Sequence, residues 1–247
     1  MKSAPAARSG ERTNPAGKPV SNKILLSLPD AEYHQIRADL EFVELEDHRV
    51  LHEPGEKLRF AYFLNSGLAS LVVVTREGRA VEAGVVGCEG LVGTALAVGL
   101  LRTPLRAVVQ IGGGAFRISG RSLQAAFRTL PELQMKLSRY AVLQGMQAAQ
   151  TAACNRLHEV RQRFARWILM AQDRVDAGTL PLTHDFLANM LGTDRPSVSL
   201  AAGALQSEKV IRYRRGVVEI LNRKRLESCA CECYGIIQAL NGDLGLR

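Results

Sequence analysis

The sequence has no uninterrupted apolar run near the ~18–20 residues that a membrane-spanning helix requires, so no segment is expected to cross a membrane. The first 20 residues also lack an apolar stretch and are therefore not a secretory signal. Their Pro, Gly, Ser, Ala and Asn content predicts a disordered tail over residues 1–21. Cysteine is scarce, and five residues, an odd number, do not make a disulfide framework. We therefore expect a cytoplasmic protein.

Acidic side chains are in the minority. The chain has 32 Lys and Arg against 24 Asp and Glu, which gives a net charge of +8. Residues 155–228 hold 13 basic and 8 acidic side chains, so this segment supplies most of the excess. A positive excess favours a polyanionic partner such as nucleic acid.

A short helix and a run of strands follow the tail. The apolar positions of residues 28–40 fall on one helical face. From about residue 42 to residue 118, short apolar strands alternate with turn signals such as Pro54-Gly55. Strands at this spacing are typical of an antiparallel barrel or roll, and we assign residues 22–130 to it.

A long helix is predicted next, over residues 131–154. From Leu143 onward the apolar positions step in threes and fours, through Met146, Ala149, Ala153, Leu157, Val160, Phe164 and Trp167. One helix as far as Arg174 would be unusually long, so we predict a break near Cys154–Asn155. The small residues in the stripe suit close packing against a partner helix, which predicts a dimerisation helix. The alternative is that this helix only covers the roll.

The next segment, residues 155–228, has the signals of two short helices and a hairpin. Thr183 is predicted to cap a helix that ends at Gly192. Asp194 is predicted to cap a second helix, with Pro196 in its first turn. The basic hairpin that follows has Arg214 and Arg215 at its tip. We expect a winged helix-turn-helix, with a C-terminal helix or tail over residues 229–247.

Together these parts resemble the Crp/Fnr superfamily of bacterial transcription regulators over about residues 28–221. The resemblance rests on LHEPGE and AYFLNSGLASLVV in the roll, RLHEVRQRFARWILM in the helix, and LTHDFLANMLGTDRPSVSLAAGALQSEKVIRYRRG in the winged domain. It implies an α+β fold: an N-terminal antiparallel β-roll of the cyclic-nucleotide-binding type (a double-stranded β-helix), a long dimerisation helix and a C-terminal winged helix-turn-helix. It also implies a homodimer that binds double-stranded DNA, acts with RNA polymerase and is not an enzyme.

The resemblance places DNA contacts on the second helix of the motif and on the wing. Arg195 aligns with an arginine that reaches a guanine edge, a contact that suits the guanidinium fork. Pro196 and Leu200 offer apolar surfaces to thymine methyl groups. We expect Thr183, His184, Arg214 and Arg215 to hold phosphates and fix the register. The full candidate set is Thr183, His184, Arg195, Pro196, Ser197, Ser199, Leu200, Arg214 and Arg215.

The effector pocket that the resemblance implies departs from the pattern of the cyclic-AMP receptors. Thr103-Pro104 stands where the phosphate-binding Arg-Ser is expected, and Arg102 and Arg106 lie only nearby. Loss of a bidentate arginine removes the main charge-assisted contact. Ala148 and Ala149 align with residues that offer hydroxyls to the adenine. We expect cyclic AMP not to be the effector of a more apolar pocket, whose candidate residues are Glu89, Leu91, Arg102, Thr103, Arg106, Ala148 and Ala149.

No metal or other cofactor is expected. The iron–sulfur branch of the superfamily uses N-terminal cysteines, and the N-terminal segment here has none. Cys229, Cys231 and Cys233 could bind a soft metal or sense redox state. In a helix, however, only Cys229 and Cys233 would share a face, and no fourth ligand is apparent. We expect these three cysteines to be ordinary small residues of a helix.

Two other functions stay open at this point. A cupin-type metalloenzyme also contains a β-roll, but it needs a cluster of His and Glu ligands on several strands. His48 and His52 are close in sequence, and no third histidine follows in the roll. The other alternative is a module for protein association whose DNA-binding domain is degenerate, because the outer face of the second helix carries little polar chemistry.

Overall fold

The computed structural model describes residues 7–175 and 177–243. Residues 7–21 differ from the predicted disordered tail, because they pack on the roll. The guanidinium of Arg12 is buried and donates to the carbonyls of Leu25 and Leu28 at 2.6 and 2.7 Å. The side chain of Val20 is fully buried. These two anchors order the segment, and residues 1–6 of the predicted tail lie outside the described residues.

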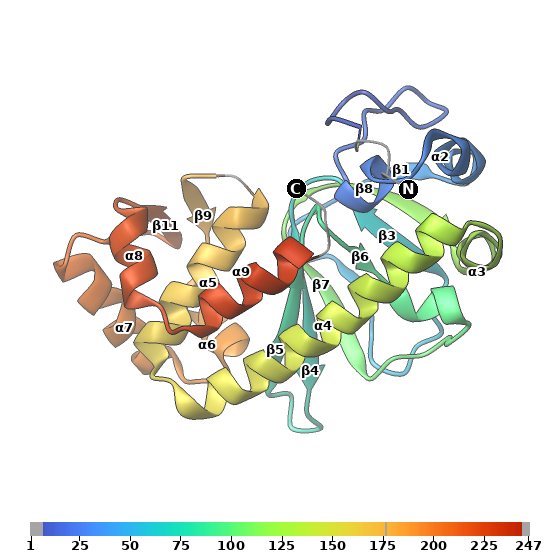
Figure 1. Ribbon diagram of the computed structural model, residues 1–247. Helices are drawn as coiled ribbons and strands as arrows, with labels where there is room; N and C mark the ends of the chain where they lie inside the picture. The colour runs from blue at the N-terminus through green and yellow to red at the C-terminus, as the bar shows by residue number, and fades with distance from the viewer. Residues whose placement is uncertain (1–6, 176, 244–247) are drawn as a thin grey trace.

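The N-terminal half is an antiparallel roll of two four-stranded sheets (Figure 1). Two short helices, α1 (Lys23–Leu26) and α2 (Asp30–Arg37), precede it and cover one end. One sheet has the order β1-β8-β3-β6 and the other β2-β7-β4-β5. Their strands are β1 (Glu41–Leu45), β2 (Val50–His52), β3 (Phe60–Leu64), β4 (Leu68–Val74), β5 (Ala80–Val86), β6 (Leu91–Val92), β7 (Leu105–Ile111) and β8 (Gly113–Ser119), with the 3-10 helix η1 (Thr94–Val98) after β6.

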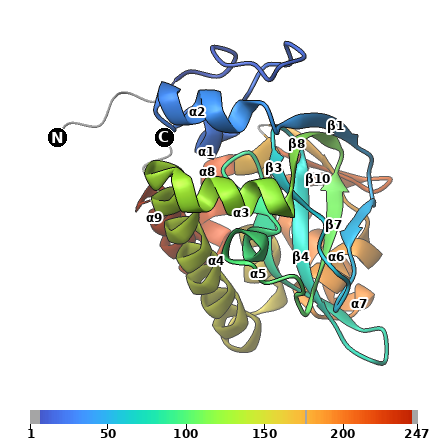
Figure 2. The ribbon, with the colours of Figure 1, turned by 90° about the vertical axis from the view of Figure 1, so that its right-hand side faces the viewer.

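Helix α3 (Gly120–Thr129) leads into the long helix α4 (Pro131–Leu157), which lies along the roll (Figure 2). The inner face of α4 is buried through Leu133, Leu137 and Tyr140. The break after α4 falls at His158–Glu159, a few residues beyond the predicted break at Cys154–Asn155. No helix within the described residues is both long enough and apolar enough to cross a membrane.

The C-terminal half contains the predicted motif and one strand that the sequence did not suggest. Its elements are α5 (Val160–Val175), β9 (Thr179–Pro181), α6 (His184–Leu191), α7 (Arg195–Ser207), β10 (Ile211–Arg214), β11 (Val217–Ile220), α8 (Arg223–Cys229) and α9 (Cys233–Asp243). The wing is a three-stranded sheet in the order β10-β11-β9, because β9 adds to the predicted hairpin. The α+β architecture of roll, long helix and winged helix-turn-helix is confirmed.

The predicted apolar stripe divides between two environments at the break after α4. Phe164 and Trp167 of α5 are buried in the core. Met146 and Leu157 of α4 are instead 49 % and 75 % exposed. The part of the stripe on α4 is therefore free to contact another molecule, whereas the part on α5 stabilises the fold.

One hydrophobic core joins the roll to the winged domain. Leu68, Val72 and Val85 of the roll share it with α5, α6 and α7. Burial of apolar surface on both sides holds the domains in one arrangement. The helix-turn-helix is therefore oriented by strands β4 and β5, which lie beside α6 (Figure 1).

A buried carboxyl group lies in this junction. Glu82 of β5 accepts hydrogen bonds from the indole Nε1 of Trp167 at 2.9 Å and from the Ser70 hydroxyl at 2.5 Å. Complete burial raises the pKa of Glu82 to about 7, although these hydrogen bonds and the Arg166 charge favour the ionised form. The folded chain therefore holds a proton on Glu82 in a pH range where the unfolded chain has released it.

We expect Glu82→Gln to change the pH dependence of stability. Between the ordinary pKa of 4.5 and about 7, the folded state binds more protons, so the free energy of unfolding falls as pH rises. The full loss is on the order of 3 kcal/mol. The glutamine of the variant stays polar but has no proton to lose in this range. The stability of the variant relative to the parent chain should therefore rise between pH 5 and pH 8, as measured by denaturant unfolding.

The matched control is Glu77→Gln, at the exposed turn between β4 and β5. Its stability should follow that of the parent chain at both pH values. A constant difference between Glu82→Gln and the parent chain from pH 5 to pH 8 would contradict a protonated Glu82.

Candidate DNA-binding surface and effector region

Local capping builds the turn between α6 and α7. The Thr183 hydroxyl accepts a hydrogen bond from the backbone N–H of Phe186 at 3.2 Å and caps α6. Gly192 ends α6 with a φ of 59°, a left-handed conformation that favours glycine. Asp194 accepts from the N–H of Ser197 at 2.7 Å and caps α7. All three predicted capping roles are confirmed.

The inner face of α7 is buried as the sequence predicts, through Val198, Ala201, Ala202 and Leu205. Its outer face is uncovered. Leu200 is 76 % exposed, and Pro196 and Gly203 are exposed beside it. The Ser199 hydroxyl turns back to the carbonyl of Arg195 at 3.0 Å, so it rises little above the helix. The result is a low surface that a groove edge can approach closely.

Arg195 stands at the first position of α7, with its side chain 65 % exposed. Its nearest acidic partner is Asp185, at 3.6 Å and itself 70 % exposed. An ion pair this long and this solvated contributes little stability. The guanidinium is therefore available to a ligand at the surface.

His184 differs from the predicted phosphate contact. Its ring stacks on Tyr213 at 4.3 Å, and Nδ1 contacts the Ser199 hydroxyl at 2.9 Å. Nε2 is buried and has no partner among the described residues. Burial of the ring and the nearby Arg195 charge lower the pKa of His184. The side chain positions α7 against the wing, and only the backbone N–H of His184, in the first turn of α6, is left to face a phosphate.

The wing carries its two arginines at a tight turn. Arg215 and Gly216 connect β10 to β11 with φ values of 49° and 77°, the signature of a type I′ hairpin. Arg214 and Arg215 are both exposed. Arg212, two residues before Arg214 in β10, pairs with Glu219 at 2.7 Å, so its charge is less available to a ligand. The turn therefore presents two adjacent positive charges next to α7.

Comparison with known proteins agrees with this geometry. The Crp-like helix-turn-helix domain matches residues 162–229. The fold is similar to that of FixK2 from Bradyrhizobium japonicum, with a TM-score of 0.67 and 16 % identity over 78 % of this chain and 98 % of that chain. Residues 162–229 are therefore a Crp-like helix-turn-helix domain, and the chain as a whole has the fold of these structures.

Two further solved structures resemble the chain in fold. TTHA1359, a transcriptional regulator from Thermus thermophilus, has a TM-score of 0.64 and 24 % identity over 77 % of this chain and 98 % of that one. The c-di-GMP-responsive regulator CLP from Xanthomonas campestris has a TM-score of 0.62 and 17 % identity over 78 % of this chain and 99 % of that one. No curated protein sequence matches this one.

The cavity between the roll and α4 is small. It measures about 160 Å³ and is lined mainly by apolar side chains, among them Leu58, Leu71, Leu91 and Leu105. Typical small-molecule sites range from ~300 to 1,000 Å³. Of the predicted pocket residues, Leu91 and Thr103 line it.

The charged residues predicted for the pocket have other partners. Glu89 accepts from Arg174 of α5 at 2.8 Å, in a pair whose side chains are 14 % and 4 % exposed. Arg106 pairs with Glu53 at 2.8 Å, and Arg102 donates to the carbonyl of Gly55. Glu89, Arg102 and Arg106 therefore have three separate partners, and none of them lines this cavity.

The long helix lines the cavity with Gln144 rather than with the predicted Ala148 and Ala149. Gln144 accepts from the Thr94 hydroxyl at 3.0 Å and donates to the Tyr140 hydroxyl at 3.1 Å. Ala149 is exposed on the outer side of α4. Gln144 precedes Ala148 by four residues, so the residue that lines the cavity lies one helical turn before the predicted one.

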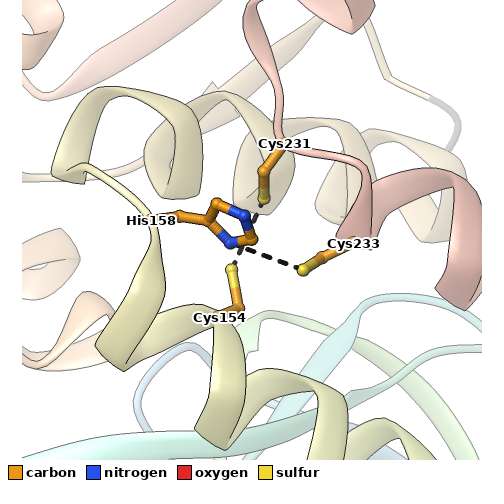
Figure 3. A group of neighbouring side chains, drawn as sticks. All are labelled: Cys154, His158, Cys231 and Cys233. Atoms are coloured by element: carbon orange, nitrogen blue, oxygen red, sulfur yellow. Dashed lines mark hydrogen bonds between the residues drawn. The ribbon is translucent and has the colours of Figure 1, made fainter.

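Potential metal ligands gather at the junction of α4 and α9, where none was expected. The segment 229–233 is not one helix, since α8 ends at Cys229 and α9 begins at Cys233. Cys231 and Cys233 therefore meet Cys154 and His158 (Figure 3). The expectation that no fourth donor is present is wrong. The spacing of Cys154 and His158, one helical turn apart, was the missed signal.

This group is the only cluster of three or more such ligands within the described residues, and it lies outside the roll. A cupin-type enzyme would need its metal ligands on the strands of the roll. The described residues thus offer no support for that alternative.

Proposed function

We propose that the chain is a transcription regulator of the Crp/Fnr type that binds an inverted-repeat DNA site as a homodimer, with α7 of each protomer in the major groove. The observation that carries the proposal is the uncovered outer face of α7, which is capped at its N-terminus by Asp194 and lies beside a basic wing. A degenerate DNA-binding domain would have no reason to keep both helix caps, the left-handed Gly192 and the exposed Arg214 and Arg215 together.

The exposed groups on α7 suit direct reading of bases. Arg195 can offer its guanidinium fork to O6 and N7 of guanine. The apolar surfaces of Pro196 and Leu200 can contact thymine methyl groups. Ser197 and Ser199 add hydroxyls near the helix start, and the low profile at Gly203 allows the groove floor to come close.

Phosphate contacts would fix the register. The wing charges at Arg214 and Arg215 lie beside α7 and are free to meet the DNA backbone. Thr183 and the first N–H groups of α6 supply hydrogen-bond donors at a helix N-terminus, where the dipole favours an anion. Such contacts position the protein without reading sequence.

The outer face of α4 supports self-association. Met135, Val142 and Met146 are 38 %, 57 % and 49 % exposed, and they follow one another at spacings of seven and four residues. Ala149 and Ala153 continue the same exposed stripe. A stripe of this period is the seam of a two-helix coiled coil. Two copies of α4 would bury it.

We further propose that cyclic AMP is not the effector. Among the described residues, no arginine lines the small cavity, and Glu89, Arg102 and Arg106 have other partners. The function proposed is binding and not catalysis. Its partners would be double-stranded DNA, a second copy of the chain and RNA polymerase, and its place of action the bacterial cytoplasm, where that DNA lies.

The contact at Arg195 is tested by pairing Arg195→Ala with Arg214→Ala. If Arg195 reads guanine, its loss should cost about 1–3 kcal/mol on the specific site and relax the preference at one base pair per half-site. Arg214→Ala should weaken specific and random DNA alike and lower the slope of log affinity against log salt by roughly 1 per protomer. Fluorescence anisotropy at three salt concentrations measures both.

The readout separates the two roles because each variant is the control of the other. A folding defect would weaken binding to every duplex. Equal losses for Arg195→Ala on the specific duplex and on a duplex with the guanine changed would assign Arg195 to a phosphate.

The dimer is tested by Val142→Glu combined with Met146→Glu. In the dimer, the two introduced carboxylates of one protomer would lie opposite those of its partner. Charge repulsion and the loss of buried apolar surface should therefore prevent association, and light scattering at micromolar concentration should give the mass of a monomer. Val50→Glu introduces a charge at another exposed apolar residue, 42 % exposed, and should leave the dimer intact. A parent chain that is already monomeric would refute the proposal.

The effector proposal is tested by calorimetry with cyclic AMP. We expect no heat of binding at physiological concentrations and DNA affinity that is the same with and without the nucleotide. A micromolar dissociation constant would refute this, and Arg106→Ala would then show whether that arginine leaves Glu53 to hold the phosphate.

A further inference from the structure

Four potential metal ligands converge where the long helix meets the C-terminal helix. Cys154 lies in the last turn of α4, and His158 is the residue that caps this helix. Cys231 lies in the linker after α8, and Cys233 begins α9. The three sulfur atoms and one ring nitrogen all lie within 4.8 Å of one another and point inward (Figure 3).

Two spacings between donor atoms match the edges of a single tetrahedral site. Sγ of Cys154 and Sγ of Cys231 are 3.5 Å apart, and Sγ of Cys233 is 3.6 Å from Nδ1 of His158. Zinc bonds of about 2.3 Å to sulfur and 2.0–2.1 Å to nitrogen give tetrahedral edges of roughly 3.5–3.8 Å. An iron–sulfur cluster distributes its thiolates over different iron ions, so its ligands need a wider frame.

The other nitrogen of His158 has the partner that a metal-bound histidine usually has. Nε2 lies 3.1 Å from a carboxylate oxygen of Glu232. Glu232 lies between Cys231 and Cys233 in the sequence. A carboxylate in this position fixes the ring and directs Nδ1 towards the ion. The amide of Gln150 also donates to Sγ of Cys233 at 3.0 Å, a bond that favours the thiolate.

Two buried arginines supply positive charge beside the thiols. Arg163 and Arg166 are 6 % and 2 % exposed. Their hydrogen bonds within the described residues go to Asn155, Thr151 and Met170, and none goes to a carboxylate. Both arginines act electrostatically on Cys154. Three thiolates around a divalent ion have a net charge of −1, which these guanidinium groups would offset.

We propose that Cys154, His158, Cys231 and Cys233 bind one zinc ion, or another thiophilic divalent ion, per protomer. On binding, the three thiols release their protons to solvent and coordinate as thiolates, while neutral His158 coordinates through Nδ1. The ion ties α9 to the end of α4, at the break that leads to the DNA-binding domain. It is a closed structural site, since all four positions are taken by protein ligands.

The test begins with the metal content of the full chain, purified anaerobically without chelator and measured by mass spectrometry of the elements. We expect one zinc ion per protomer in the parent chain and in Cys229→Ser. Cys229 is the matched control, because it is adjacent in sequence but outside the cluster. Cys231→Ser and Cys233→Ser should each lose the ion.

Cobalt(II) provides a second measurement on the parent chain alone, so the conclusion does not depend on whether a cysteine variant folds. Replacement of the ion by Co²⁺ should give thiolate-to-cobalt charge transfer and the intense visible bands of tetrahedral coordination. Glu232→Gln should keep these bands but weaken Co²⁺ affinity about 10–100-fold, because it removes the support of His158.

Several outcomes would overturn the proposal. Zinc supplementation that leaves the parent chain without a bound ion, or Co²⁺ that gives no charge-transfer band, would do so. If the purified chain contains iron together with acid-labile sulfide, the ligands hold an iron–sulfur cluster and not a single ion. A parent chain with a mass two hydrogens lower, from a Cys154–Cys231 disulfide, would make the group a redox pair instead.

Discussion

The arrangement of the molecule depends on the junction between the β-roll and α5, where Glu82 accepts hydrogen bonds from Trp167 and Ser70 inside an apolar core. A buried carboxyl group without partners is costly, so its bonds to the two domains hold them in register as well as together. Glu89 and Arg174 form a second polar link between the same domains. Because α6 and α7 pack on α5, the direction in which α7 presents its outer face follows from this junction.

This constraint also explains what became of the expected effector pocket. Glu89, which the resemblance places beside a ligand, pairs instead with Arg174 of the DNA-binding half. The cavity that is left is closed on the side of α4 by Gln144, which bonds to Thr94 and Tyr140. In this arrangement the roll acts as a rigid support that shares its core with the winged domain.

The parts that the sequence predicted well are those determined by local chemistry. Caps at Thr183 and Asp194, the left-handed Gly192 and the buried face of α7 depend on neighbours a few residues away. The parts that it missed depend on distant contacts. Cys154 and Cys231 are 77 residues apart, and nothing in the local pattern of either shows the other. Gln144 of α4, rather than Ala148 one helical turn later, lines the cavity, and periodicity alone does not distinguish these two positions. The ordering of residues 7–21 likewise rests on Arg12 and Val20, two anchors in a stretch whose composition resembles a flexible tail.

Gly192 has a second role beyond ending α6. A Cβ atom added at this residue would lie 2.8 Å from Cγ2 of Val81 in β5. The turn between α6 and α7 therefore contacts the roll too closely for a side chain at this position. Two independent demands, a left-handed backbone and contact with another domain, meet at one residue. The motif is therefore not an interchangeable module: a winged domain grafted from a relative onto this roll would have to bring both the glycine and the shape of its surroundings, or the two halves would not close on each other.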